Sequence, residues 1–165
     1  MFISTPTGKG AYALHFNIAT QKNLQIGRLG RFTFPAGDYI YLGSALGPGG
    51  LKARISCHLR GDGHPHWHID YLRERADLIG YCYIETDLQQ ECLWSQTLAS
   101  LPEASIPVPN FGASDCKFSA KGCPAHLISF SSGIHSGRLQ GTLAAASVLL
   151  QQSMRYCSFI CDFKP

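Results

Sequence analysis

The sequence predicts an α/β (α+β) domain with a small antiparallel sheet of about three core strands flanked by helices. Three observations support this class. Residues 11–19 and 38–43 alternate in side-chain type in the manner of strands. Residues 51–60 and 88–101 carry apolar residues at helical spacing. Strand-like and helix-like segments also follow one another along the chain, which is typical of a mixed fold.

The strands are expected mainly in the first half of the chain. The first three span residues 11–19, 24–34 and 38–43 and predict an antiparallel meander. In the first of them Tyr12, Leu14 and Phe16 share one face, as in a half-buried strand. Two further strands are expected over residues 76–86 and, at an edge, residues 125–130.

Four helices are expected, and the first has the clearest apolar stripe. Leu51, Ile55 and Leu59 recur every fourth residue. The other helices are expected over residues 67–75, 88–101 and 138–154. Asp87 stands where the third helix needs an N-cap, and Gln90 follows three residues later, as in a capping box.

Length and composition predict a single domain over residues 1–165. The chain has 165 residues, of which 45% are hydrophobic, and this is enough for one sizeable core. We expect the core over about residues 10–130 and a C-terminal extension over residues 133–165. Residues 102–109 are rich in proline, but the segment is too short to predict a domain boundary.

The N-terminal residues lack the basic start and the apolar run of a secretion signal. No stretch reaches the roughly 18 apolar residues that cross a bilayer. We therefore expect a cytoplasmic protein without a membrane partner. The formal net charge of +3 permits a nucleic-acid partner without requiring one. Seven cysteines, an odd number in a chain without an export signal, indicate reduced thiols or a metal rather than a disulfide framework.

The first predicted helix carries a basic face. Arg54 and His58 are four residues apart and can reach a common anion, and Lys52 and Arg60 flank them. A guanidinium binds phosphate oxygens in a forked manner, and an imidazole transfers protons near neutral pH. An ordinary solvated helix face explains the same spacing.

Glu91 falls in line with the apolar stripe of the third predicted helix, which includes Leu88 and Leu98. An unpaired carboxylate in a partly buried position costs several kcal/mol, on the order of magnitude, so a metal ion or an arginine is expected beside it. Alternatively, Glu91 only complements the helix dipole at the edge of the stripe.

Tyr12 and Tyr41 are interpreted on spacing alone as core tyrosines, but their combination with the residues above resembles the GIY-YIG nuclease superfamily. The matching residues are Gly10-Ala11-Tyr12, Tyr41-Leu42-Gly43, Arg54 and Glu91. The likeness is strongest to a little-characterised branch known only as a domain of unknown function, some of whose members are fused to a base-excision DNA glycosylase. It rests on YIYLGSALGPGGLKARISCHLR, HPHWHIDYL, QQECLWSQTL, and FGASDC followed by CPAHLISF.

The resemblance implies a metal-dependent endonuclease that hydrolyses DNA phosphodiester bonds, associated with DNA repair. The segment between Tyr12 and Tyr41 is longer than is usual in the superfamily, which predicts an extra hairpin, and residues 138–154 predict a C-terminal helix. It places one Mg²⁺ or Mn²⁺ ion on Glu91, a phosphate-stabilising role on Arg54 and proton transfer on His58. Tyr12 is implied as the base or as a hydroxyl that orients the water, and Tyr41 as a second hydroxyl close to the attacked phosphate. As a base, Tyr12 is expected to have a pKa lowered by nearby positive charge. The implied nucleic-acid contacts are Ser44, Lys52 and Arg60.

Cysteine and histidine suggest a different site. The residues Cys116, Cys123, His126, Cys157 and Cys161 can supply a tetrahedral zinc site. The remaining cysteines, Cys57, Cys82 and Cys92, lie on apparent core elements and are expected as small apolar residues. His64, His66 and His68 form a second cluster, which we interpret as structural, with Trp67 and Tyr71 packed inward and Asp70 paired with a histidine or an arginine.

Two other functions remain open at the level of sequence. One is a nucleic-acid-binding module that keeps the fold without hydrolysis. The other is a zinc-stabilised interaction domain, which predicts stoichiometric metal and loss of fold on chelation.

Overall fold

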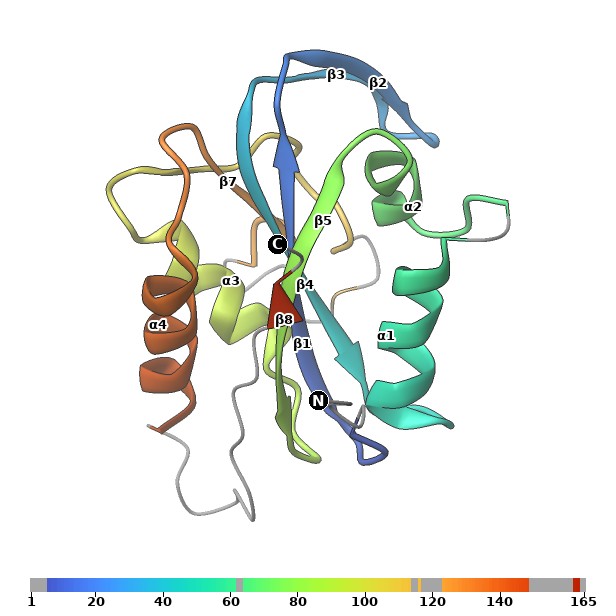
Figure 1. Ribbon diagram of the computed structural model, residues 1–165, viewed down its shortest axis with the longest axis vertical. Coiled ribbons are helices and arrows are strands. Elements are labelled where there is room, and N and C mark those ends of the chain that lie inside the picture. The colour runs from blue at the N-terminus through green and yellow to red at the C-terminus, as the bar shows by residue number, and fades with distance from the viewer. Residues whose placement is uncertain (1–5, 62–63, 114–115, 117–122, 149–161, 164–165) are drawn as a thin grey trace.

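The sheet is built around β1 (Gly10–Ile18) in the computed structural model, which describes residues 6–61, 64–113, 116, 123–148 and 162–163. β1 pairs antiparallel with β4 (Gly37–Ala45) on one side and with β5 (Asp77–Glu85) on the other (Figure 1). The strand order is β6-β7-β4-β1-β5-β8. Beyond β4 lie β7 (Leu127–Phe130) and then β6 (Ala104–Ser105), and beyond β5 lies β8 (Asp162–Phe163).

The hairpin of β2 (Lys22–Ile26) and β3 (Gly30–Phe34) forms a separate two-stranded sheet at one end of the molecule (Figure 1). The expected meander is therefore wrong, because β1 pairs with β4 and not with the segment that follows it. Burial explains the difference. β2 and β3 alternate between partly buried and exposed residues, which is typical of a hairpin with one solvent-exposed face. In contrast, β1 and β4 are buried along nearly their whole length.

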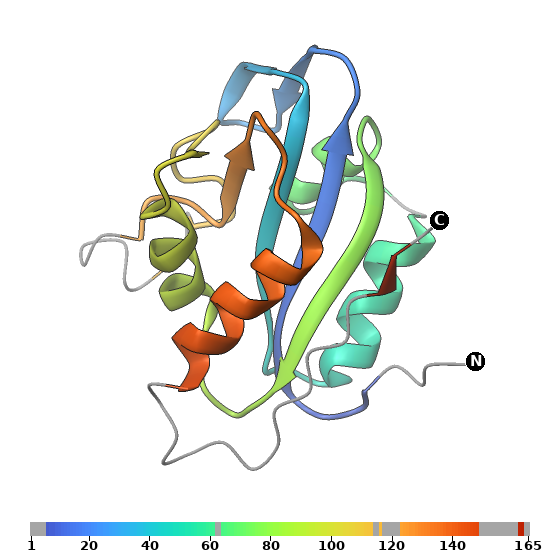
Figure 2. The same ribbon diagram turned by 60° about the vertical axis from the view of Figure 1, so that its left-hand side comes forward.

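Helices cover both faces of the sheet (Figures 1 and 2). The helices α1 (Gly50–Arg60) and α2 (His68–Arg73) pack on the face that carries Tyr12, Leu14 and Phe16. The helices α3 (Glu91–Ala99) and α4 (Ser136–Val148) pack on the face that carries Ala11 and Ala13. β1 is thus buried on both faces and not half-buried as expected, because two helical layers sandwich it.

Two helix details differ from the sequence-based expectations. In α1 the residue that joins Leu51 and Ile55 in the buried face is His58, while Leu59 is exposed. A spacing of seven residues closes two helical turns, whereas a spacing of eight drifts off the face. α3 begins at Glu91 and is preceded by Gln90, so Asp87 is not its N-cap. Asp87 belongs to a turn that Thr86 closes by accepting a hydrogen bond from the N–H of Leu88.

The expected fold class is confirmed: a small antiparallel sheet is flanked by helices, with an extra hairpin and a helix near the C-terminus. β7, expected at an edge, lies between β4 and the two-residue strand β6. Within the described part of the chain, no helix has the length and apolar character needed to cross a membrane.

Candidate functional site

A pocket of about 460 Å³ opens where β4 continues past the end of β7. β7 runs along β4 only as far as Tyr41, which pairs with Leu127, while β4 extends to Ala45. The backbone beyond Tyr41, from Leu42 to Ser44, lines the pocket. Because the sheet is narrower here, side chains from the helices of both faces reach the same hollow.

All five residues expected to be catalytic line this pocket, although they come from distant parts of the chain: Tyr12, Tyr41, Arg54, His58 and Glu91. Ser44, expected to contact nucleic acid, lines it as well. Lys52 and Arg60 lie exposed on α1 and are not among the described residues that form its walls. The structure therefore brings together the five side chains that the sequence singled out, and Lys52 and Arg60 flank them on the exposed surface of α1.

Tyr12 and His58 form a buried pair inside the pocket. The Tyr12 hydroxyl lies 2.9 Å from Nε2 of His58. Tyr12 stands opposite Gly43 in the pairing of β1 and β4. A Cβ atom at Gly43 would lie 2.2 Å from Cζ of Tyr12, so a glycine is required for the ring to occupy this place. The Tyr-Leu-Gly signature thus has a steric explanation.

Burial sets the protonation of this pair. Loss of solvent lowers the pKa of His58 to about 4, a shift that Arg73 and Arg54 reinforce and Asp70 opposes. Burial also raises the pKa of Tyr12 and that of Tyr41, and the nearby Arg54 only partly offsets this. The expected lowering of the Tyr12 pKa is therefore wrong, because desolvation of the phenolate outweighs the attraction of the guanidinium. The neutral imidazole is the better proton acceptor of the two.

Arg54 and Trp67 lie at the rim of the pocket. The guanidinium carbon of Arg54 lies 4.8 Å from the centroid of the Trp67 ring, in cation–π range. Trp67 is 37% exposed and lines the pocket, so the expectation that it packs inward is wrong. Asp70 accepts hydrogen bonds from the backbone N–H groups of His66 and Trp67 at the start of α2, which takes the place of the expected pairing with a histidine or arginine side chain.

Glu91 is buried, with 7% of its surface exposed, in the first turn of α3. Its Oε1 accepts a hydrogen bond of 3.3 Å from Gln89, and its Oε2 has no hydrogen-bond partner among the described residues. A buried carboxylate oxygen without a partner is costly and calls for a ligand. The location of Glu91 agrees with both sequence interpretations, because the residue lies in the first turn of a helix, where it complements the dipole, and also lines the pocket, where a cation could bind.

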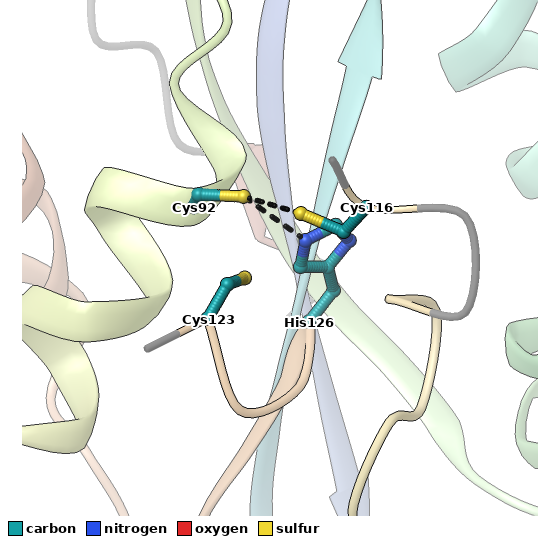
Figure 3. Close-up of side chains that lie close together, drawn as sticks. All are labelled: Cys92, Cys116, Cys123 and His126. Atoms are coloured by element: carbon teal, nitrogen blue, oxygen red, sulfur yellow. Dashed lines mark hydrogen bonds between the residues drawn. The ribbon is translucent and has the colours of Figure 1, made fainter. Parts of the chain in front are cut away.

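A second cluster borders the same pocket. Its members are Cys92, Cys116, Cys123 and His126, whose ligand atoms all lie within 4.8 Å of one another (Figure 3). The sulfurs of Cys92 and Cys116 are 3.0 Å apart, and the Cys92 sulfur lies 3.7 Å from Nε2 of His126. Burial raises the pKa of Cys92 and lowers that of His126. The cluster can bind a metal ion, and its soft thiolate donors favour zinc.

The sequence predicted three of these four residues. Cys116, Cys123 and His126 come together as expected, whereas Cys157 and Cys161 lie outside the described residues. Cys92 was expected as a core thiol and is instead the fourth member, because α3 buries Glu91 and Ser95 and turns Cys92 toward the cluster. The register of the apolar stripe already places residue 92 beside the stripe and not in it, and this is the signal that could have identified it.

The other cysteines and histidines behave differently. Cys57 is a free, half-buried thiol, and Cys82 is buried and disulfide-bonded, which corrects the expectation of a reduced thiol there. His68 accepts a hydrogen bond from the N–H of Gly112, and His66 packs edge-on against Trp67. His64, His66 and His68 take no part in the one metal-ligand cluster found among the described residues. A larger hollow of about 750 Å³ beside the hairpin contains none of the candidate site residues.

Comparison with known proteins identifies a family for this chain. Residues 11–144 match the family described as "Domain of unknown function DUF123". No curated protein and no protein of solved structure gives a significant match.

Proposed function

The chain belongs to the family described as domain of unknown function DUF123, and from the contents of the pocket we propose that it is a metal-dependent endonuclease that hydrolyses DNA phosphodiester bonds. The observation that carries the proposal is the convergence of a buried acid, a guanidinium and a phenol–imidazole pair on one hollow. Its resemblance to the GIY-YIG branch, some of whose members are fused to a base-excision DNA glycosylase, supports a place in DNA repair.

The first requirement for this reaction is to neutralise the phosphodiester. An anionic phosphodiester repels nucleophiles, so a catalyst must bind its oxygens with positive charge. Arg54 is the cation that lines the pocket in the described part of the chain. Its contact with the Trp67 ring restrains the guanidinium at the pocket rim. In the proposed reaction Arg54 binds the non-bridging oxygens of the phosphate.

The second requirement is a path for the proton of the attacking water. In the proposed reaction the water gives its proton to the Tyr12 oxygen while Tyr12 gives its own to Nε2 of His58, which is neutral at pH 7 in the tautomer with its proton on Nδ1. As the bond between the water oxygen and phosphorus forms, the bond to the leaving sugar oxygen breaks. Tyr41, kept protonated by burial, gives a proton to that oxygen.

Glu91 fits a hard divalent cation. Glu91 lines the pocket, and its buried Oε2 has no hydrogen-bond partner among the described residues. Mg²⁺ typically binds one or two protein carboxylates together with water and substrate phosphates. When bound, Mg²⁺ or Mn²⁺ would offset the negative charge that develops on the phosphate and the leaving oxygen.

The test is a cleavage assay on single-stranded, duplex and branched DNA with Mg²⁺ or Mn²⁺. We expect Glu91→Gln to lower the rate about 100-fold or more, since it removes the charge of the cation ligand. Tyr12→Phe should lower the rate about tenfold to 1,000-fold, since it interrupts the proton path. Glu74→Gln is the matched control, because Glu74 is exposed and away from the pocket.

Undiminished cleavage by Glu91→Gln would rule out the cation assignment. If the wild-type protein cuts none of these substrates, the hydrolase proposal fails, and binding without cleavage would favour a nucleic-acid-binding module of the same fold.

The Cys92, Cys116, Cys123 and His126 cluster favours a second candidate, a zinc-stabilised interaction domain. This candidate uses residues other than Glu91 and Tyr12. It predicts stoichiometric zinc in a protein without hydrolytic activity and unfolding on chelation.

A further inference from the structure

We infer that Cys92, Cys116, Cys123 and His126, hereafter the Cys3His cluster, hold a zinc ion in tetrahedral geometry, and that this ion fixes the wall of the pocket on which Glu91 lies (Figure 3). The zinc site and its effect on the pocket wall are independent of the reaction. The effect of the ion on catalysis rests on the proposed hydrolase function.

The spacing of the four ligand atoms suits zinc. Zinc binds thiolate sulfur at about 2.3 Å and imidazole nitrogen at about 2.0–2.1 Å, so the atoms of a tetrahedral set lie about 3.5–3.8 Å apart. The Cys92 sulfur lies 3.7 Å from Nε2 of His126 and 3.0 Å from the Cys116 sulfur, and all four atoms lie within 4.8 Å of one another. Shifts of about an ångström or less would seat the ion.

Core packing alone does not explain the Cys3His cluster. A buried cysteine that acts as a small apolar residue needs only apolar neighbours. Here three sulfurs and one imidazole nitrogen face one another, as Figure 3 shows, and two of the cysteines are only half-buried.

The Cys3His cluster joins segments that are far apart in the sequence. Cys92 lies in the first turn of α3, Cys116 follows the turn at Asn110–Ala113, and Cys123 and His126 precede β7. The last two segments are already paired by backbone hydrogen bonds, from Asn110 to Pro124 and from His126 to Phe111. A zinc ion would tie this pair of segments to the start of α3.

The Cys3His cluster and the pocket share a wall. Cys116 and His126 line both, and Cys92 is the chain neighbour of Glu91. Gly112 lies close to both His126 and Tyr41, because a Cβ atom there would lie 3.1 Å from the Tyr41 ring and 3.2 Å from Cβ of His126. An ion that holds Cys92 and His126 therefore restrains Glu91 and Tyr41 relative to each other.

The metal site is tested by measuring zinc in the full chain purified without chelator. We expect about one zinc per chain in the wild type, and at least a tenfold lower content in Cys123→Ser. Cys57→Ser is the matched control and should keep the wild-type content, since Cys57 is a free thiol outside the Cys3His cluster. Replacing zinc by Co²⁺ should give the visible absorption of a tetrahedral thiolate site. A wild type that takes up no zinc, or a Cys123→Ser variant that keeps it, would overturn the inference.

The role in the pocket is tested by amide hydrogen exchange before and after removal of zinc with a chelator. We expect exchange to rise at least tenfold in peptides from the start of α3 and from residues 110–113, with β1 and β5 unchanged, and to recover on adding zinc back. Unchanged exchange in the wall, or an equal rise in β1 and β5, would contradict a local role. Neither measurement uses DNA. A wild type that binds zinc yet cuts no substrate would therefore contradict the proposed function and leave the zinc site standing.

Discussion

Two carboxylates are buried to the same degree in this protein, yet their surroundings are opposite. Asp38 on β4 is 8% exposed, and Glu91 on α3 is 7% exposed. Asp38 accepts hydrogen bonds from Asn17 at 2.8 Å and from the N–H of Ile134 at 2.8 Å, and it lies 3.1 Å from Nε2 of His15. Glu91 has one long bond to Gln89 and an oxygen with no partner among the described residues.

The difference separates a structural acid from a candidate functional one. The network of Asp38 connects β1, β4 and the loop before α4, and both of its carboxylate oxygens have partners. Glu91 lines a pocket, and its Oε2 has no hydrogen-bond partner among the described residues. Such a buried oxygen costs stability in the free protein until a cation or another donor binds it. The two acids should therefore respond to mutation in opposite ways.

Asp38→Ala should have the largest effect on stability. It removes the acceptor of the hydrogen bonds from Asn17 and from the Ile134 N–H, and it removes the ion-pair partner of His15. Removing one member of a buried charged network typically costs about 3–5 kcal/mol. We expect a decrease of about 3 kcal/mol in the free energy of unfolding, measured by urea titration. A decrease below about 1 kcal/mol would show that the network is not the structural element described here.

Acid should remove the contribution of Asp38 gradually. Burial alone would raise the pKa of this carboxyl, but the hydrogen bonds from His15, Asn17 and the Ile134 N–H lower the pKa from 3.8 to about 2. A depressed pKa gives stability that is present above the ordinary value and is lost as pH falls through the folded value. We expect wild type to lose about 2 kcal/mol relative to Asp38→Asn between pH 5 and pH 2. A constant difference between the two proteins over this range would contradict the assignment.

Glu91→Gln should have the smallest effect on stability and the opposite sign. The amide keeps the shape of the side chain and removes the negative charge from a group whose Oε2 has no hydrogen-bond partner among the described residues. We expect the free energy of unfolding, without added divalent cation, to stay the same or rise by about 1 kcal/mol. Urea titration beside Asp38→Asn measures this. A loss of about 2 kcal/mol or more would mean that the Glu91 charge has a structural partner.

The sequence predicted the residues that local periodicity controls. The spacing of α3 placed Glu91 in line with Leu98, and burial of both confirms it. The spacing of α1 placed Arg54 and His58 on one face, and both line the pocket. The prediction that Leu59 ends the apolar stripe of α1 was wrong, since Leu59 is exposed. A four-residue repeat drifts from the helical period of 3.6 residues.

The parts that depend on long-range pairing were not predictable. Nothing local shows that β1 skips the hairpin to pair with β4, since residues 24–34 also have strand character. The Cys3His cluster needs α3 to meet the segment before β7, a contact between residues 92 and 126 that no local pattern encodes. Trp67 was misplaced because an exposed tryptophan held by Arg54 has the same sequence appearance as a core one.

The most direct test of the central claim is a Mn²⁺ titration of zinc-loaded protein, followed by electron paramagnetic resonance, without nucleic acid. If Oε2 of Glu91 binds a divalent cation in the pocket, the wild type should bind one Mn²⁺. Glu91→Gln should then weaken that binding at least tenfold, while Asp38→Asn leaves it unchanged. Equal binding by wild type and Glu91→Gln, or no binding by the wild type, would contradict the account.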